Sequence, residues 1–172
     1  MQAIKKLKMV IIVFGLPGSG KSYFATRLAA KLDAIYVNSD QLRMNMFSTR
    51  TYTDAEKLLV YDSMSAAMTD ALITNRAIVL DATFYKEAIR NSFEQKAAAF
   101  NERIIYIEVT APEDIIAERL ERPRYSEADF AVYLKLKALF EPMQQEHLVL
   151  ISSNSDIAPA LLQAIEYINT AK

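Results

Sequence analysis

Hydrophobic positions along the chain follow two alternating patterns. Short, continuous apolar runs are typical of strands buried on both faces of a parallel sheet, and they occur at Met9–Phe14, Ala34–Val37, Ala77–Leu80, Ile104–Val109 and Leu148–Ile151. Longer segments with apolar residues three and four positions apart predict helices, at Ser22–Leu32, Asp54–Thr74, Lys86–Phe100, Pro112–Glu121, Glu127–Phe140 and Ile157–Asn169. Five strands interleaved with helices predict an α/β fold whose parallel sheet is covered on both faces.

Polar residues mark several of the predicted helix boundaries. Thr53 and Thr110 each stand three positions before a glutamate, which is the capping-box pattern, and Ser126 precedes an aspartate by the same spacing. Asn75 and Asn101 follow predicted helices, where asparagine can adopt the left-handed conformation that glycine usually supplies. We expect helices to begin and end at these positions.

Length and composition limit the classes of protein to consider. The chain of 172 residues predicts one domain, residues 1–172. With no cysteine and one histidine, His147, it lacks the residues for a disulfide or a multi-histidine metal site, and a Ser-His-Asp mechanism is disfavoured. The 20 Lys and Arg residues are balanced by 21 Asp and Glu residues, which disfavours a long nucleic-acid path.

The N-terminal segment superficially resembles a signal peptide. Lys5, Lys6 and Lys8 precede the apolar run Met9–Phe14, but no Ala-x-Ala cleavage pattern follows. The run is also far shorter than the roughly 18 residues needed to span a bilayer. We therefore expect a cytoplasmic protein without a membrane partner.

All three glycines of the chain, Gly15, Gly18 and Gly20, fall within six residues. Together with Lys21 and Ser22 they form the pattern G-x-x-x-x-G-K-S of a phosphate-binding loop. A buried strand is predicted before the loop and a helix after it, as this pattern requires. The alternative is a glycine-rich turn from strand to helix with no ligand.

The loop chemistry predicts ATP and Mg²⁺ as ligands. Backbone N–H groups converge on phosphate oxygens, and the positive end of the following helix dipole favours the anion. Lys21 is expected to reach the β- and γ-phosphates, and Ser22 to bind Mg²⁺. The expected nucleotide-binding residues are Gly15, Pro17, Gly18, Ser19, Gly20, Lys21 and Ser22.

Two aspartates are expected beside the phosphates because each follows a predicted strand. Ligands of parallel α/β sheets bind at the carboxyl ends of the strands. Asp81 is the candidate to hold Mg²⁺, and Asp40 is the candidate catalytic base for the acceptor hydroxyl, with the reverse division left open. Arg43, one helical turn after Asp40, is expected to bind substrate. The alternative for either aspartate is a helix cap or a solvated loop charge.

Three arginines gather near residues 112–130, where Pro123 is expected to end a helix. Arg119, Arg122 and Arg124 on a short helical lid would supply cations to the transferring phosphate and exclude water. We therefore expect Arg119 and Arg122 to be catalytic and Arg124 to contact substrate. The alternative is a surface helix on which Glu118 and Arg122 form an i,i+4 ion pair.

Four motifs together resemble the small P-loop kinases of the polynucleotide-kinase-like and zeta-toxin-like group, often identified only as AAA-type ATP-binding proteins. They are GLPGSGKS at 15–22, NSDQLR at 38–43, LDATF at 80–84 and RLERPRYSEADF at 119–130. The resemblance implies a three-layer fold with sheet order 2-3-1-4-5. It also implies a base at Asp40, a substrate contact at Arg43, lid residues near ATP at Arg119 and Arg122, and substrate-facing Thr83 and Arg90.

The resemblance implies ATP-dependent phosphorylation of a hydroxyl and leaves the acceptor open. A monomeric or homodimeric kinase for a small metabolite is our leading hypothesis. The alternatives are a 5′-hydroxyl polynucleotide kinase, a toxin that phosphorylates a cell-wall precursor and a nucleotide-dependent regulatory switch. The switch is disfavoured because the chain lacks the Asn-Lys-x-Asp guanine signature.

Overall fold

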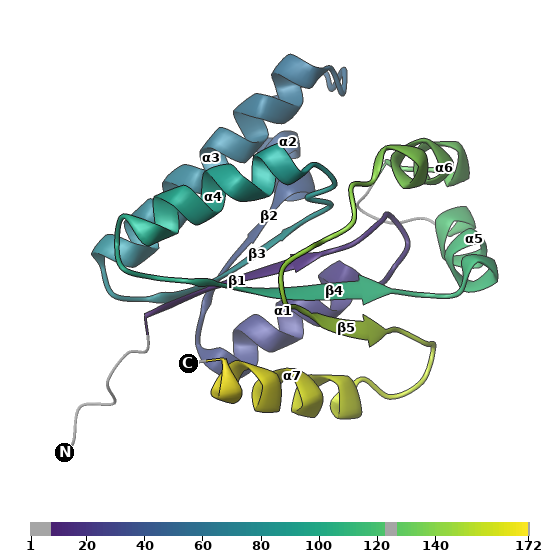
Figure 1. Ribbon diagram of the computed structural model, residues 1–172. Coiled ribbons are helices and arrows are strands. Elements are labelled where there is room, and N and C mark those ends of the chain that lie inside the picture. Colours follow the sequence, from purple (N-terminus) through teal and green to yellow (C-terminus); the bar gives the residue numbers. More distant parts are fainter. Residues whose placement is uncertain (1–7, 123–126, 172) are drawn as a thin grey trace.

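The five predicted strands pair in one parallel sheet of order β2-β3-β1-β4-β5, which confirms the expected fold class (Figure 1). The computed structural model describes residues 8–122 and 127–171. The strands are β1 (Met9–Phe14), β2 (Ile35–Asn38), β3 (Ala77–Ala82), β4 (Ile104–Thr110) and β5 (Leu148–Ile151). The sheet follows the apolar runs, because a strand covered on both faces can expose no polar side chain without cost.

The central strand β1 is buried at all six of its positions. Because successive side chains point to opposite faces, Ile11 and Val13 enter one core and Ile12 and Phe14 enter the other. Two cores that share one strand hold that strand firmly in place. The loop that follows β1 therefore starts from a rigid point.

Helices cover both faces of the sheet in a three-layer arrangement (Figure 1). The helices are α1 (Lys21–Leu32), α2 (Ser39–Met46), α3 (Asp54–Ile73), α4 (Glu87–Ala98), α5 (Glu113–Glu121), α6 (Phe130–Leu139) and α7 (Ala158–Thr170). Side chains of α1 and α7 fill one core, and those of α3 and α4 fill the other. In the described ranges, every helix is too short or too polar to span a bilayer.

The helices α5 and α6 lie beyond the carboxyl ends of the strands, as Figure 1 shows. They form a small apolar cluster of their own from Ile116, Leu120 and Tyr133, against which Leu16 of the glycine loop packs. The pair therefore contacts the loop directly and is not a detached flap.

Helix α2 is longer than the single turn expected after Asp40. It runs from Ser39 to Met46, and the Asn38 side chain caps it by accepting a hydrogen bond from the Gln41 N–H at 2.9 Å. Its buried residue is Arg43, a charged one. A helix whose buried residue is charged has no apolar stripe, so the hydrophobic pattern of the sequence did not predict the full length of α2.

The predicted caps are correct in part. The Thr53 side chain caps α3 by accepting from the Glu56 N–H, as expected. The prediction for Thr110 was wrong, because α5 begins after Pro112 without a side-chain cap. Asp129 itself caps α6, which therefore begins three residues later than predicted. Asn75 and Asn101 do adopt positive φ, at 52° and 56°.

Candidate active site

The glycine loop between β1 and α1 approaches neighbouring backbone too closely for side chains. A Cβ on Gly15, whose φ is 150°, would lie 2.2 Å from the carbonyl oxygen of Val109 in β4. Gly20, with φ of 92°, is the N-cap residue of α1. The loop thus delivers backbone N–H groups to the positive end of α1, which is an arrangement suited to an anion.

Arg119 and Ser152 brace this loop from its outer side. The Arg119 Nη1 donates to the carbonyl oxygen of Gly18 at 3.1 Å and to Ser152 Oγ at 2.8 Å. Ser152 Oγ donates to the carbonyl oxygen of Ser19 at 2.5 Å. Because N–H and C=O point in opposite directions in a trans peptide, fixing the Ser19 carbonyl aims the Gly20 N–H away from Ser152.

The position of Arg119 differs from that expected for an arginine on a mobile flap. Its guanidinium also donates to Asn154 Oδ1 at 3.2 Å, and no carboxylate within the described ranges pairs with it. Burial lowers the pKa of Arg119, although an arginine remains charged at neutral pH. The residue therefore holds a positive charge next to the loop without a neutralising partner.

One cavity, of about 570 Å³, opens on the Arg119 side of the loop. Apolar side chains of Phe24, Val109 and Leu150 line it together with Gly20, and polar residues 152–156 after β5 contribute to its wall. A cavity with apolar walls and polar residues at one side suits a ring system that carries hydrogen-bonding groups.

Asp81 lies inside β3, not after it as predicted, and is fully buried. Its Oδ2 accepts hydrogen bonds from the Tyr36 hydroxyl at 2.7 Å and from Asn38 Nδ2 at 2.6 Å. Asn38 Nδ2 also lies 3.4 Å from Ser22 Oγ, which connects Asp81 to the first turn of α1. Burial, reinforced by the Asp81 charge, raises the pKa of Tyr36, so the hydroxyl remains a donor.

The second oxygen of Asp81, Oδ1, is buried and has no hydrogen-bond partner among the residues that the structure describes. A buried carboxylate oxygen without a partner is costly, and a bound cation or an ordered water would satisfy it. Ser22 and Asp81 therefore fit an oxygen-ligated Mg²⁺ site, in which phosphates and water complete the ligand set.

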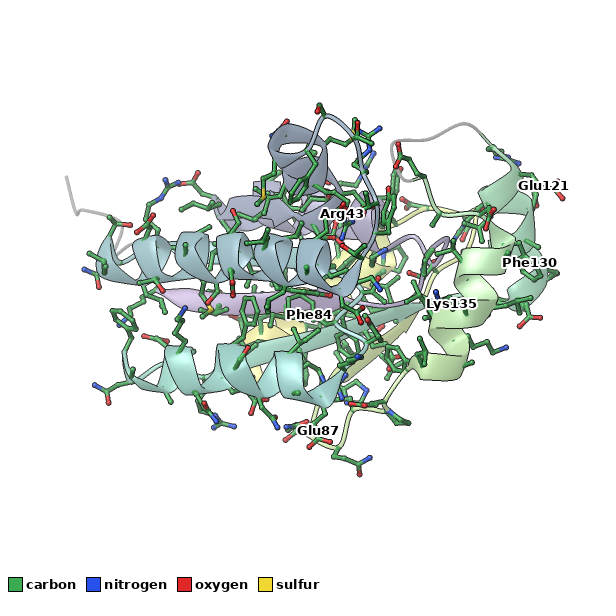
Figure 2. All side chains as sticks on the ribbon, turned by 90° about the horizontal axis from the view of Figure 1, so that it is seen from above. Arg43, Phe84, Glu87, Glu121, Phe130 and Lys135 are labelled. Atoms are coloured by element: carbon green, nitrogen blue, oxygen red, sulfur yellow. The ribbon has the colours of Figure 1, made fainter. Side chains whose placement is uncertain are left out.

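Asp40 and Arg43 lie together at the start of α2. Arg43 Nη1 lies 3.3 Å from Asp40 Oδ1, and its Nε lies 2.9 Å from Glu56 Oε1 in α3. The guanidinium carbon of Arg43, Cζ, lies over the Tyr52 ring, 4.8 Å from the ring centroid. Figure 2 shows Arg43 between α2 and the start of α3. Arg43 is thus buried and positioned by two carboxylates, whereas the Asp40 side chain remains 31% exposed.

Glu56 anchors this cluster. Burial alone would raise its pKa, but hydrogen bonds from the backbone and hydroxyl of Thr51 and from the Tyr52 N–H, with the Arg43 charge, lower it. The N–H of Thr51 donates to Glu56 Oε2 at 2.6 Å. Glu56 therefore stays ionised and holds the loop before α3 against Arg43.

A second cavity, of about 280 Å³, lies between α2, α3 and α6. Asp40 and Arg43 line it from α2, Tyr61 lines it from α3 and Leu136 lines it from α6. Lys21 also lines this cavity, whereas the preceding residue, Gly20, lines the larger one. The glycine loop therefore lies between the two cavities, with Gly20 on the larger one and Lys21 on the smaller one.

Glu127, just before α6, reaches across to the loop that precedes α3. It accepts hydrogen bonds from Arg50 Nε at 2.9 Å and from the Tyr52 hydroxyl. The hydrogen bonds from Arg50 and Tyr52 lower the pKa of Glu127 to about 2. Burial, with the hydrogen bond to Glu127, raises the pKa of Tyr52 to about 12. This contact joins the two walls of the smaller cavity.

The remaining predicted site residues are placed differently from one another. Thr83 lines the smaller cavity. Arg90 does not line it, because its guanidinium donates to the carbonyl oxygens of Phe84 at 2.8 Å and Glu141 at 2.9 Å, which gives it a structural role.

Arg122 forms the i,i+4 ion pair with Glu118 that was the alternative to a lid role, although it also lines the larger cavity. Arg124 lies outside the described residues.

Sequence reasoning missed Asn38, Glu56, Ser152 and Glu127 as members of the site. Asn38 could have been found, because it precedes Ser39 and Asp40 directly at the end of a predicted strand. Ser152 follows the last predicted strand in the same way and carries the same signal. No sequence signal marked Glu56 and Glu127, because their partners lie on other elements and only the folded chain brings them together.

Comparison with known families and structures agrees with this architecture. A family profile described as an AAA domain matches residues 10–143. None of the curated protein sequences matches the chain.

Solved structures with the same fold cover nearly the whole chain. A gluconokinase from Sinorhizobium meliloti 1021 has a TM-score of 0.75 at 15% identity, covering 96% of this chain and 94% of its own. The Mycobacterium tuberculosis APS kinase CysC, in complex with AMPPNP and APS, has a TM-score of 0.73 at 16% identity, covering 95% and 99%. Chaetomium thermophilum Kti12, in complex with ADP-AlF3, has a TM-score of 0.73 at 21% identity, covering 94% and 98%. At these identities the similarity establishes the fold.

Proposed function

The chain belongs to the AAA domain family, and from that premise we propose that it is a single-domain, ATP-dependent kinase for a hydroxyl group of a small molecule. The observation that carries the proposal is the glycine loop between two cavities, with Gly20 on one and Lys21 on the other. A kinase needs a donor and an acceptor on opposite sides of the transferring phosphate. The two cavities supply those two positions.

The larger cavity is the proposed site for the nucleotide. Its apolar wall suits the base, and the loop N–H groups with Lys21 suit the phosphates. Arg119 provides an unpaired charge beside the loop. The nucleotides in the related APS kinase and Kti12 structures support this assignment.

Mg²⁺ is the proposed metal, held by Ser22 and Asp81. The unpartnered Oδ1 of Asp81 and the Asn38 amide that connects the two side chains support this assignment. Bound Mg²⁺ would neutralise phosphate charge that develops during transfer. Tyr36 and Asn38 orient the carboxylate for that purpose.

Asp40 is the proposed catalytic base, and Arg43 positions its carboxylate. The acceptor hydroxyl loses its proton to Asp40, and its oxygen forms a bond to the γ-phosphorus. The bond from that phosphorus to the β–γ bridging oxygen breaks, and ADP leaves with the electron pair. Lys21 stabilises the negative charge on the phosphate oxygens throughout.

The size of the smaller cavity favours a small molecule over a polynucleotide. Its volume of about 280 Å³ is slightly below the roughly 300–1,000 Å³ usual for ligand pockets. The contact of Glu127 with Arg50 and Tyr52 joins its walls, which leaves little room for a polymer end. The narrower similarity to polynucleotide-kinase-like and zeta-toxin-like kinases is proposed on the four sequence motifs, among which the Asp40–Arg43 pair is the most specific.

Replacing the two aspartates one at a time tests the proposal. Asp40→Asn should leave ATP binding intact in calorimetry and lower phosphate transfer from γ-labelled ATP to a metabolite panel by roughly 10²–10⁴-fold. Asp81→Asn should instead weaken the dependence of nucleotide binding on Mg²⁺. The reverse pattern would exchange the two roles.

Asp62→Asn is the matched control, because Asp62 is an exposed aspartate on α3 outside both cavities. It should behave as the wild type in both measurements. If the wild type binds ATP but transfers phosphate to no hydroxyl compound in a broad panel, the kinase assignment fails.

A further inference from the structure

Lys135 lines the smaller cavity from α6. Of the four cationic residues in the cavity lining, Lys21 and Lys135 have no hydrogen bond or ion pair among the described residues, and Lys21 belongs to the glycine loop. Figure 2 shows Lys135 on the side of α6 that faces α3. Lys135 is exposed, so its ammonium group is available to a ligand that enters the cavity from solvent.

Most other charged side chains of the cavity already have an ion-pair partner or a proposed role. Arg43 is paired with Asp40 and Glu56, and Glu127 is paired with Arg50. Lys21 belongs to the glycine loop and is assigned to the phosphates. Lys57 on α3 pairs with Asp54 at 3.4 Å, but the Asp54 side chain is 89% exposed and such a pair contributes little. The Lys57 Nζ also lies 5.9 Å from the centroid of the Tyr85 ring. The charged side chains that remain available to a ligand are therefore the two lysines, Lys57 on α3 and Lys135 on α6.

Apolar side chains lie beside these lysines. Val60 lines the cavity from α3, and Val132, Leu136 and Leu139 line it from α6. Thr83 and Tyr85 add hydroxyl groups. A ligand bound against these side chains would remove part of their surface from water, which strengthens any ion pair that the ligand makes with a lysine.

We propose that the phosphate acceptor is an anionic small molecule whose carboxylate or phosphate group binds Lys135, with Lys57 on the opposite wall as a second contact. The proposal rests on the proposed kinase function, because it names the class of molecule that the acceptor cavity takes. Lys135 is thus a specificity-determining residue, while Asp40 at the other end of the cavity receives the hydroxyl proton.

The test uses matched pairs of compounds. Hydroxylated carboxylates and hydroxylated phosphate monoesters are each compared with the neutral polyol of the same carbon number. Binding to the full chain is measured by calorimetry in the presence of AMPPNP and Mg²⁺, and phosphate transfer is measured with γ-labelled ATP. The carboxylate and phosphate arms distinguish which anionic group the cavity accepts.

We expect anionic compounds to bind and to accept phosphate, and neutral polyols to do neither at the same concentration. Lys135→Gln should raise the acceptor KM about tenfold with little change in kcat or in the KM for ATP, since it removes a charge-assisted hydrogen bond. Lys135→Arg should restore most of the affinity, because it keeps the positive charge. A merely structural role for Lys135 would not produce this split between KM and kcat.

Lys137→Gln is the control on the same helix. Lys137 bonds Glu113 at 2.5 Å and does not line the acceptor cavity. This variant should keep the wild-type KM for the acceptor. If Lys137→Gln and Lys135→Gln raise the KM equally, the effect comes from the stability of α6 and the proposal is overturned.

Failure of the proposal and failure of the kinase function give different results. Equal phosphorylation of neutral and anionic compounds, or an unchanged KM in Lys135→Gln, would overturn the anionic acceptor and leave the kinase intact. Binding of anions that depends on Lys135, without phosphate transfer to any compound, would support the anion site and overturn the kinase. Absence of both binding and transfer across the panel would overturn the anion site.

Discussion

The two sides of the glycine loop are formed by different parts of the chain, mainly backbone on one side and side chains on the other. On the Arg119 side, backbone atoms approach one another closely, as where Gly15 meets the carbonyl of Val109. On the Asp40 side, charged and aromatic side chains from three separate elements meet, as where Arg43 joins Glu56 under Tyr52. The first arrangement has almost no room for added atoms, whereas the second depends on which side chains are present.

This difference indicates how the two halves respond to substitution. A backbone cradle recognises phosphate groups through N–H groups that every residue has, so it constrains residue size more than residue type. A cavity lined by side chains can change its ligand by changing one of them. The proposed donor is therefore tied to the fold, and the proposed acceptor is tied to individual residues such as Lys135.

Gly15→Ala is expected to have the largest effect on this comparison. The added Cβ would lie 2.2 Å from a backbone oxygen that cannot move alone, so the free energy of unfolding should fall by about 2–3 kcal/mol. ATP binding should be lost. Urea denaturation and calorimetry measure the two effects.

Gly18→Ala is the matched control, since its Cβ would meet side chains of Ile116 and Leu120 at 3.0 Å, which can shift. It should cost less than Gly15→Ala. Wild-type ATP affinity in Gly15→Ala would refute the view that this close approach shapes the loop.

Arg119→Gln should have the next largest effect and should be confined to the nucleotide side. It removes hydrogen bonds to the Gly18 carbonyl, Ser152 and Asn154, so the Kd for ATP should rise about tenfold. The KM for the acceptor should stay unchanged. Arg103→Gln, at an exposed arginine that lines neither cavity, should leave both constants unchanged.

Glu56→Gln should show the opposite selectivity. Loss of the carboxylate that holds Arg43 and the Thr51 backbone should raise the acceptor KM several-fold and leave the Kd for ATP unchanged. The variant should also melt at a lower temperature than the wild type at pH 7. An effect on ATP affinity equal to that on the acceptor would show that the two halves are coupled.

The stability difference between wild type and Glu56→Gln should depend on pH in a defined direction. The folded protein lowers the pKa of Glu56 below its ordinary value of 4.5. The carboxylate therefore contributes its full stability above that value, and the contribution is lost as the pH falls through the lower, folded pKa. Melting curves of both proteins between pH 7 and strongly acidic pH measure the convergence.

Glu127→Gln should have the smallest effect, because its partners lie at the surface. Loss of the ion pair with Arg50 should raise the acceptor KM a few-fold and leave the melting temperature at pH 7 nearly unchanged. With the pKa of Glu127 at about 2, the difference between the two proteins in KM should be the same at pH 6 and pH 8. A difference that grows between these values would mean that another group controls the contact.

Elements with strong local signals could be predicted from the sequence. The bounds of β1 and β5 agree with their apolar runs, and Asn75 and Asn101 adopt positive φ as their residue type predicted. Thr110 was predicted as a cap from spacing alone, which failed because the chain begins α5 after Pro112. Ser126, predicted in the same way, lies outside the described residues, and α6 begins after Asp129. Spacing shows which residues could cap a helix, and packing decides where the helix begins.

The amino-acid sequence by itself determined the order of strands and helices, the phosphate-binding loop and the chemistry expected at its edge, because these depend on neighbouring residues and backbone conformation. Tertiary structure alone decided that Arg119 braces the loop, that Arg90 binds backbone carbonyls and that Lys135 lines the acceptor cavity. Those roles depend on contacts between residues far apart in the chain, and such contacts leave no periodicity or spacing that a single sequence could reveal.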